Sequence, residues 1–91
     1  MSDARVVLIT GAGKGLGRAF AMDLARRGVR IVVNNRIRDA QPDSARDVGS
    51  AIESAGGVAI AETSDVTAPD AADAMVSAAL GAYGRLDGVV F

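Results

Sequence analysis

The amino-acid sequence predicts an α/β fold, a doubly wound parallel sheet in the order β-α-β-α-β-α-β. Short apolar runs typical of strands buried on both faces alternate with segments of helical periodicity. The joints are short, and no repeat or low-complexity linker interrupts the alternation. Right-handed crossovers then give the strand order 3-2-1-4. Residues 1–91 are expected to form one small domain.

The first predicted unit is a strand at residues 5–10 followed by a helix at 16–27. The strand is the apolar run Val6-Val7-Leu8-Ile9. Gly28 stands where a C′ glycine ends a helix. Four apolar residues of the helix keep helical spacing and are expected to line its inner face: Leu16, Ala19, Phe20 and Leu24.

The second unit begins with a strand at 29–34, built on Ile31-Val32-Val33. A polar loop over 35–39 follows, and Pro42 is expected to open a helix that Gly56-Gly57 closes. The apolar residues expected on the inner face of that helix are Ala45, Val48, Ile52 and Ala55.

The third unit is a strand at 58–62 and a helix that Gly84 terminates, and a fourth strand follows at 86–91. Thr67-Ala68-Pro69-Asp70 has the pattern of a capping box with proline in the first turn of the helix. The apolar face predicted for this helix comprises Ala72, Val76, Ala79, Leu80 and Tyr83.

The joint between the first strand and the first helix carries Thr-Gly-x-x-x-Gly-x-Gly over 10–17. Such a strand–turn–helix joint brings backbone N–H groups and the positive helix end to an anion. Gly11 permits the sharp turn, Gly15 lets the backbone approach a phosphate, and Gly17 lets the helix pack closely on the strand. The residues expected to hold a dinucleotide pyrophosphate are Gly11, Gly13, Lys14, Gly15, Leu16 and Gly17. The alternative is that the glycines only punctuate a surface loop.

Two other phosphate-binding patterns do not fit this turn. A strict Gly-x-Gly-x-x-Gly fails because Leu16 stands three residues beyond Gly13. The Walker A pattern fails because Lys14 is followed by glycine and not by serine or threonine. The spacing therefore narrows the prediction to one subtype of dinucleotide turn.

Composition excludes several other classes of function. A net charge of −1 gives no electrostatic case for binding nucleic acid or an anionic membrane. The sequence has no cysteine, which excludes disulfides and fits a reducing cytoplasm. It also has no histidine. Carboxylates are not clustered at metal-ligand spacing, so no metal site is expected. We expect neither a secretory signal nor a membrane span.

On these residues the chain resembles the N-terminal part of a short-chain dehydrogenase/reductase, with half of its Rossmann fold. The resemblance runs from the glycine turn through Asp65-Val66 to the segment 83–91, Tyr-Gly-Arg-Leu-Asp-Gly-Val-Val-Phe. Within the family it is most similar to 3-oxoacyl carrier-protein reductases and to the hydroxyacyl dehydrogenase part of peroxisomal multifunctional enzymes. The resemblance implies hydride transfer between NADP(H) and an alcohol or ketone in a full-length member.

The end of the second strand bears on the choice of cofactor. A carboxylate about 20 residues after the glycine turn normally binds the ribose 2′-OH of NAD. That place is taken by Asn35, with Arg36 beside it and Lys14 in the turn. A missing carboxylate and two cations favour the 2′-phosphate of NADP over NAD. The alternative is that both cations are solvated surface charges.

The resemblance assigns the pair Asp65-Val66 to the adenine, through the carboxylate of Asp65 and an apolar contact of Val66. The alternative is that Asp65 merely ends the strand and steers the loop toward Thr67. Tyr83 ends an apolar helical face, and Asp87 rather than lysine stands four residues later. We therefore expect Tyr83 to pack in the core and not to act in catalysis.

The chain carries no catalytic constellation of this family. The chemistry implied by the resemblance requires a serine and a Tyr-x-x-x-Lys pair, and Lys14 is the sole lysine. We expect the chain alone to be inactive and to end before the catalytic half. Two hypotheses remain: the N-terminal segment of an NADP-dependent oxidoreductase, or a stand-alone nucleotide-binding or assembly module.

The last strand suggests a partner. Segment 86–91 would form a sheet edge carrying Val89, Val90 and Phe91, with no proline or lysine to prevent strand pairing. We expect a homo-oligomer joined at or near this edge.

Overall fold

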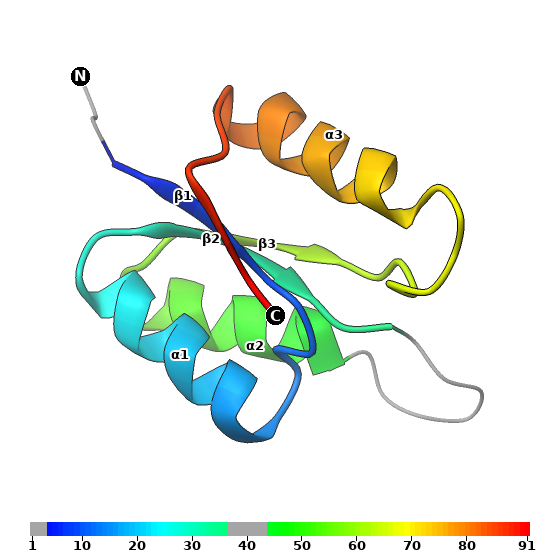
Figure 1. Ribbon diagram of the computed structural model, residues 1–91. Coiled ribbons are helices and arrows are strands. Elements are labelled where there is room, and N and C mark those ends of the chain that lie inside the picture. The colour runs from blue at the N-terminus through cyan, green and yellow to red at the C-terminus, as the bar shows by residue number, and fades with distance from the viewer. Residues whose placement is uncertain (1–3, 37–43) are drawn as a thin grey trace.

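The computed structural model describes residues 4–36 and 44–91, and it confirms the predicted fold (Figure 1). One parallel sheet has the strand order β3-β2-β1-β4. The elements are β1 (Val6–Ile9), α1 (Gly15–Arg26), β2 (Arg30–Asn34), α2 (Ser44–Ser54), β3 (Ala59–Glu62), α3 (Ala71–Tyr83) and β4 (Gly88–Val90). The predicted opening of the second helix at Pro42 lies outside the described residues.

The sheet is covered on both faces, and each face has its own core. Helices α1 and α2 lie on one face and α3 lies on the other (Figure 1). Ile9, Ile31 and Val33 face α1 and α2, whereas Val6, Leu8 and Val32 face α3. Adjacent residues of β1 and β2 thus alternate between two buried faces, which is why both strands read as continuous apolar runs.

The inner face predicted for α1 is largely wrong, although Leu24 is half-buried against the core as predicted. Ala21 and Ala25 are buried, whereas Ala19, Leu16 and Phe20 are exposed, Leu16 by 69%. The start of α1 lies close against the turn that follows β1, since a Cβ on Gly17 would lie 2.6 Å from the Gly11 carbonyl oxygen. The small residues Ala21 and Ala25 fit between the helix and the sheet, whereas Leu16 and Phe20 point to solvent.

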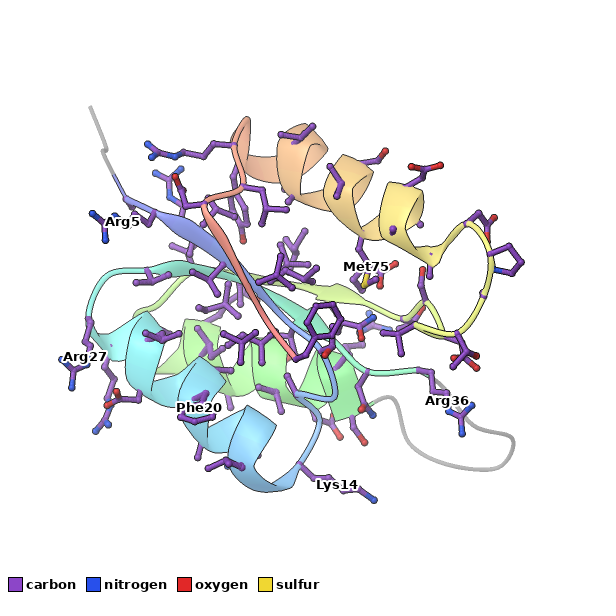
Figure 2. The ribbon with its side chains drawn as sticks, viewed as in Figure 1. Arg5, Lys14, Phe20, Arg27, Arg36 and Met75 are labelled. Carbon is purple, nitrogen blue, oxygen red and sulfur yellow. The ribbon has the colours of Figure 1, made fainter. Side chains whose placement is uncertain are left out.

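The inner face predicted for α3 is also largely wrong. Ala71, Met75 and Ala79 are buried, and Met75 points from α3 toward the sheet (Figure 2). Of the five residues predicted there, only Ala79 is buried; Tyr83 is half-buried, and the exposed ones are Ala72, Val76 and Leu80. In α2 the prediction is confirmed for Ala45, Val48 and Ile52, whereas Ala55 is exposed.

The predicted capping box is wrong as well. Helix α3 starts after Asp70, whose side chain makes no capping hydrogen bond, and Thr67 lies three residues before this N-cap. Thr67 instead donates from both its backbone N–H and its hydroxyl to Asp65. The carboxylate thus occupies both donors of the residue that the pattern assigned to the cap.

Tyr83 packs against the core on the α3 face, as predicted. The Arg30 guanidinium carbon lies 5.7 Å from the centre of its ring. Its hydroxyl is buried and has no hydrogen-bond partner within the described part of the chain. Burial raises the pKa of this phenol above its usual value.

Strand β4 lies at the edge of the sheet and is fixed to β1 at its start. Asp87 Oδ2 accepts from the Val6 backbone N–H at 2.8 Å, and the Asp87 N–H donates to the Val6 carbonyl at 2.8 Å. The same carboxylate pairs with Arg85, whose Nη2 lies 2.7 Å from Oδ1. Donation from the Arg85 side chain, the Val6 N–H and the nearby charges lower the pKa of Asp87.

Candidate functional site: a pocket at the carboxyl ends of the strands

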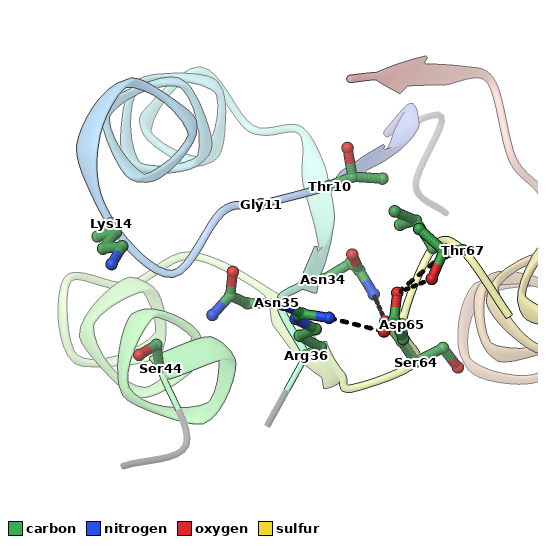
Figure 3. A pocket seen from close by; sticks show the side chains of 11 residues that line it. Thr10, Gly11, Lys14, Asn34, Asn35, Arg36, Ser44, Ser64, Asp65 and Thr67 are labelled. Atoms are coloured by element: carbon green, nitrogen blue, oxygen red, sulfur yellow. Dashed lines mark hydrogen bonds and ion pairs between the residues drawn. The ribbon is translucent and has the colours of Figure 1, made fainter. Parts of the chain in front are cut away.

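A pocket of about 400 Å³ lies where β1, β2 and β3 end (Figure 3). This is the edge of a doubly wound sheet at which ligands bind, beside the reversal in strand order. Three segments line it: the turn after β1, the residues after β2, and the loop between β3 and α3. Its lining residues are Thr10, Gly11, Lys14, Asn34, Asn35, Arg36, Ser44, Ser64, Asp65, Val66 and Thr67.

The glycine turn leaves its backbone open. Gly11 has φ +60° and Gly15 has φ +62°, and a Cβ on either would meet nothing within 4 Å. Both therefore adopt a left-handed conformation that glycine alone adopts readily, and both face free space. A ligand oxygen can approach this backbone without displacing protein atoms, so the turn fits a phosphate group.

Gly13 and Gly17 have a different role, which is internal packing. A Cβ on Gly13 would lie 2.5 Å from the Ser44 Cβ and 2.7 Å from Asn35 Nδ2. The turn is also tied to β2, since the Ala12 N–H donates to the Asn34 carbonyl at 2.8 Å. These contacts fix the turn relative to the residues that follow β2.

Asn34 anchors the floor of the pocket. It is 1% exposed, and its Nδ2 donates to Glu62 Oε1 at 2.7 Å and to the Ser64 carbonyl at 3.0 Å. Glu62 Oε1 also accepts from the Ser64 N–H at 3.0 Å, and Oε2 accepts from the Ser64 hydroxyl. Breaking these hydrogen bonds would leave a buried amide without partners, which is costly. The network therefore holds the β3–α3 loop against the end of β2.

Arg36, Asp65 and Thr67 form the outer rim. Arg36 Nη1 lies 2.8 Å from Asp65 Oδ2, and Asp65 Oδ1 accepts from the Thr67 N–H at 2.9 Å and the Thr67 hydroxyl at 2.7 Å. The Thr67 N–H, then the Thr67 hydroxyl and then Arg36, lower the pKa of Asp65 to about 2. Asp65 is therefore ionised at neutral pH, and it steers the loop as the alternative interpretation expects.

The structure brings together six of the residues predicted for the site. They line the pocket: Gly11, Lys14, Asn35, Arg36, Asp65 and Val66. Gly13, Gly15, Leu16 and Gly17 do not line it, although Gly15 faces free space in the same turn. Lys14 and Arg36 stand apart within the pocket, because the Arg36 side chain is directed at Asp65 (Figure 3).

Sequence reasoning missed five lining residues: Thr10, Asn34, Ser44, Ser64 and Thr67. Asn34 carried a usable signal, since it is a polar residue at the end of an apolar strand. Ser64 and Thr67 flank Asp65, and nothing in the local pattern separates them from ordinary loop residues.

The pocket is built for binding a polar ligand. Asp65 is the one carboxylate lining the pocket whose pKa is shifted. That pKa lies far below the range useful for general acid–base catalysis at neutral pH. Over residues 4–36 and 44–91, no cluster of side chains gathers that could ligate a metal ion. No helix in those ranges has the length and apolar character needed to cross a bilayer.

Comparisons with known proteins agree with this geometry. The short chain dehydrogenase family model matches residues 5–91. Peroxisomal multifunctional enzyme type 2 of Mus musculus is 43% identical over 97% of this chain, which covers 12% of that protein. A short chain dehydrogenase from Mycobacterium avium is 40% identical with a TM-score of 0.86, over 93% of this chain and 32% of that one.

A further similar structure was solved with a bound cofactor. It is a metagenomic short-chain oxidoreductase in complex with NADP, 34% identical with a TM-score of 0.80, over 93% of this chain and 37% of that one. The chain therefore belongs to the short-chain dehydrogenase family, a family of NAD(P)-binding oxidoreductases. It spans little more than a third of these relatives at most.

Proposed function

We propose that residues 1–91 are the N-terminal cofactor-binding segment of a short-chain oxidoreductase and bind the adenosine and pyrophosphate parts of NADP. The observation that carries the proposal is the placement of two complementary surfaces in one pocket. The open glycine backbone at Gly11, continued by Gly15 in the same turn just outside the lining, suits phosphates. Asp65 and Val66 lie at the other end of the pocket, where the family resemblance places the adenine.

The preference for NADP over NAD rests on the residues between those ends. Asn35 lines the pocket at the position where a carboxylate would repel a 2′-phosphate. Lys14 and Arg36 line the same pocket and supply positive charge there. The relative solved with NADP is consistent with this choice.

The segment contributes binding and orientation rather than bond-making. When bound, the nicotinamide cofactor supplies hydride transfer, which in the full-length relatives converts an alcohol and a ketone into one another. In this chain Asp65 is held ionised and serves as a fixed acceptor at the pocket rim. The glycine turn presents backbone donors to the phosphates.

Calorimetric titration of the chain with NADP and NAD tests the proposal. We expect NADP to bind more tightly than NAD, with adenosine 2′,5′-bisphosphate competing for the same site. Absence of binding for every adenine ligand would refute the cofactor-binding role. Equal affinities for NADP and NAD would refute the preference and leave the role intact.

We further propose that residues 1–91, as an isolated chain, self-associate through the outer edge of β4, which has no strand beside it among the described residues. The edge carries Val89 and Phe91, which are 45% and 92% exposed, beside the unpaired side of β4. Exposed apolar edge strands pair readily with a second strand.

A further inference from the structure

Arg36 is engaged before any ligand arrives. Its Nη1 donates to Asp65 Oδ2 at 2.8 Å across the outer rim, while Lys14 lies at the opposite end of the pocket (Figure 3). The side chain expected to bind a 2′-phosphate is thus held by the carboxylate expected to accept the adenine amino group.

The two ends of this ion pair are held unequally. Asp65 is fixed through Oδ1 by both donors of Thr67, whereas Arg36 has Asp65 Oδ2 as its one side-chain partner within residues 4–36 and 44–91. Both side chains are partly exposed, by 47% for Arg36 and 37% for Asp65. Exposed pairs of this kind are weak, so a stronger anion can exchange for the carboxylate at Arg36 while Asp65 stays in place.

We propose that Asp65 tunes the preference for a 2′-phosphate by competing with it for Arg36, an inference that rests on the proposed cofactor-binding function. A 2′-phosphate must draw the guanidinium away from Asp65 before Arg36 can bind it, so part of the binding free energy of that phosphate is spent on breaking the ion pair. A ligand without that phosphate leaves the ion pair in place. Asp65 is therefore a specificity-determining residue that weakens selectivity for NADP.

The inference predicts a change in an affinity ratio. Adenosine 2′,5′-bisphosphate and 5′-AMP differ only in the 2′-phosphate, so the ratio of their affinities isolates that group. Asp65→Asn removes the competitor while keeping an oxygen acceptor for Thr67, and any loss of adenine contact affects both ligands equally. We expect the ratio to rise about two- to fivefold in favour of the 2′-phosphate.

Removal of a negative charge could raise the same ratio without involving Arg36, and two controls separate the causes. Asp73→Asn removes one carboxylate from the exposed side of α3 and should leave the ratio unchanged. In an Arg36→Gln background, Asp65→Asn should no longer raise the ratio, because the contested side chain is gone.

Each remaining outcome counts for or against the inference. An unchanged ratio in Asp65→Asn, a fall, or a rise that persists in the Arg36→Gln background would overturn it. Circular dichroism establishes that each variant folds, and Asp65→Ser replaces Asp65→Asn if the latter does not. Loss of binding of both ligands to the unsubstituted chain would instead refute the cofactor-binding function itself.

Discussion

The two flanks of β1 are built differently. On one flank, β2 is buried from Ile31 to Asn34. Helices α1 and α2 cover it on one face of the sheet, and α3 covers it on the other. On the other flank, β4 pairs with β1 over only Gly88–Val90 and leaves Val89 exposed. The polar side chains of the pocket come almost entirely from the buried flank, whereas the β4 flank presents apolar surface.

The two flanks also differ in how firmly the loops at their carboxyl ends are held. The ends of β2 and β3 are cross-linked by Asn34, Glu62 and Ser64, so their loops hold fixed positions around the pocket. Strand β4 is joined to the turn through the Val90 carbonyl, which accepts from the Thr10 N–H at 2.9 Å and from the Thr10 hydroxyl at 3.4 Å. We therefore expect the proposed ligand recognition to depend on the β2–β3 flank and the proposed self-association to depend on the β4 flank.

The largest expected effect is at the turn that both flanks share. Gly15→Val should abolish binding of NADP and NAD alike, because the side chain would occupy the free space that the phosphates need. Valine is also strained at φ +62°, so the matched control is Gly28→Val, at φ +89° with equally open surroundings and outside the pocket. If titration shows that Gly15→Val binds as well as Gly28→Val does, the turn has only a structural role.

Next in size is the choice of cofactor on the β2 flank. Arg36→Asp should shift preference from NADP toward NAD by about 1–3 kcal/mol, because it removes a cation and adds a repulsive carboxylate beside the ribose. Arg5→Asp makes the same charge change at the opposite end of β1 and should leave the preference unaltered. Parallel titrations with both cofactors measure the shift, and an equal shift in the two variants would mean that long-range charge alone is responsible.

The strand order could be predicted because strands and helices alternate along the sequence and crossovers are right-handed. The glycine turn could be predicted because its glycines have a fixed spacing. Continuous apolar runs mark strands buried on two faces, and Gly11, Gly15 and Gly17 occupy positions with backbone or packing requirements. The helix faces could not be predicted in the same way. In α1 and α3 the sheet accepts alanine and methionine, and the larger Phe20 and Leu80 lie outside, since the gap between helix and sheet is set by tertiary packing.

Two of the three residues of the outer rim, Arg36 and Asp65, could be predicted as site residues, but their pairing could not. Arg36 and Asp65 are far apart in sequence, and nothing in their local patterns indicates that they pair with each other. Likewise Thr67 matches a capping pattern, yet it donates to Asp65 two residues earlier, and helix α3 starts only after Asp70.

A smaller effect is expected from the network that makes the β2 flank rigid. Asn34→Ala should destabilise the fold by about 1–3 kcal/mol, because Glu62 and the Ser64 carbonyl lose a donor at a buried position. Ser77→Ala, on the exposed side of α3, should change stability by less than about 0.5 kcal/mol. Urea denaturation followed by circular dichroism measures both, and equal stabilities of the two variants would show that the network contributes nothing.

The smallest effect in free energy is expected at the β4 edge, where contacts between copies are few and exposed. Sedimentation velocity across a range of concentrations should show reversible association that Val89→Lys weakens, because a lysine on the edge opposes strand pairing. Val89 is a better probe than Val90, which is half-buried against the core on the α1 face. Val76→Lys places the same side chain on the exposed apolar side of α3 and should leave association intact if the edge is responsible. If Val76→Lys alone weakens association, the contact between copies lies on α3 and not at the β4 edge. A monomer at every concentration would contradict self-association altogether.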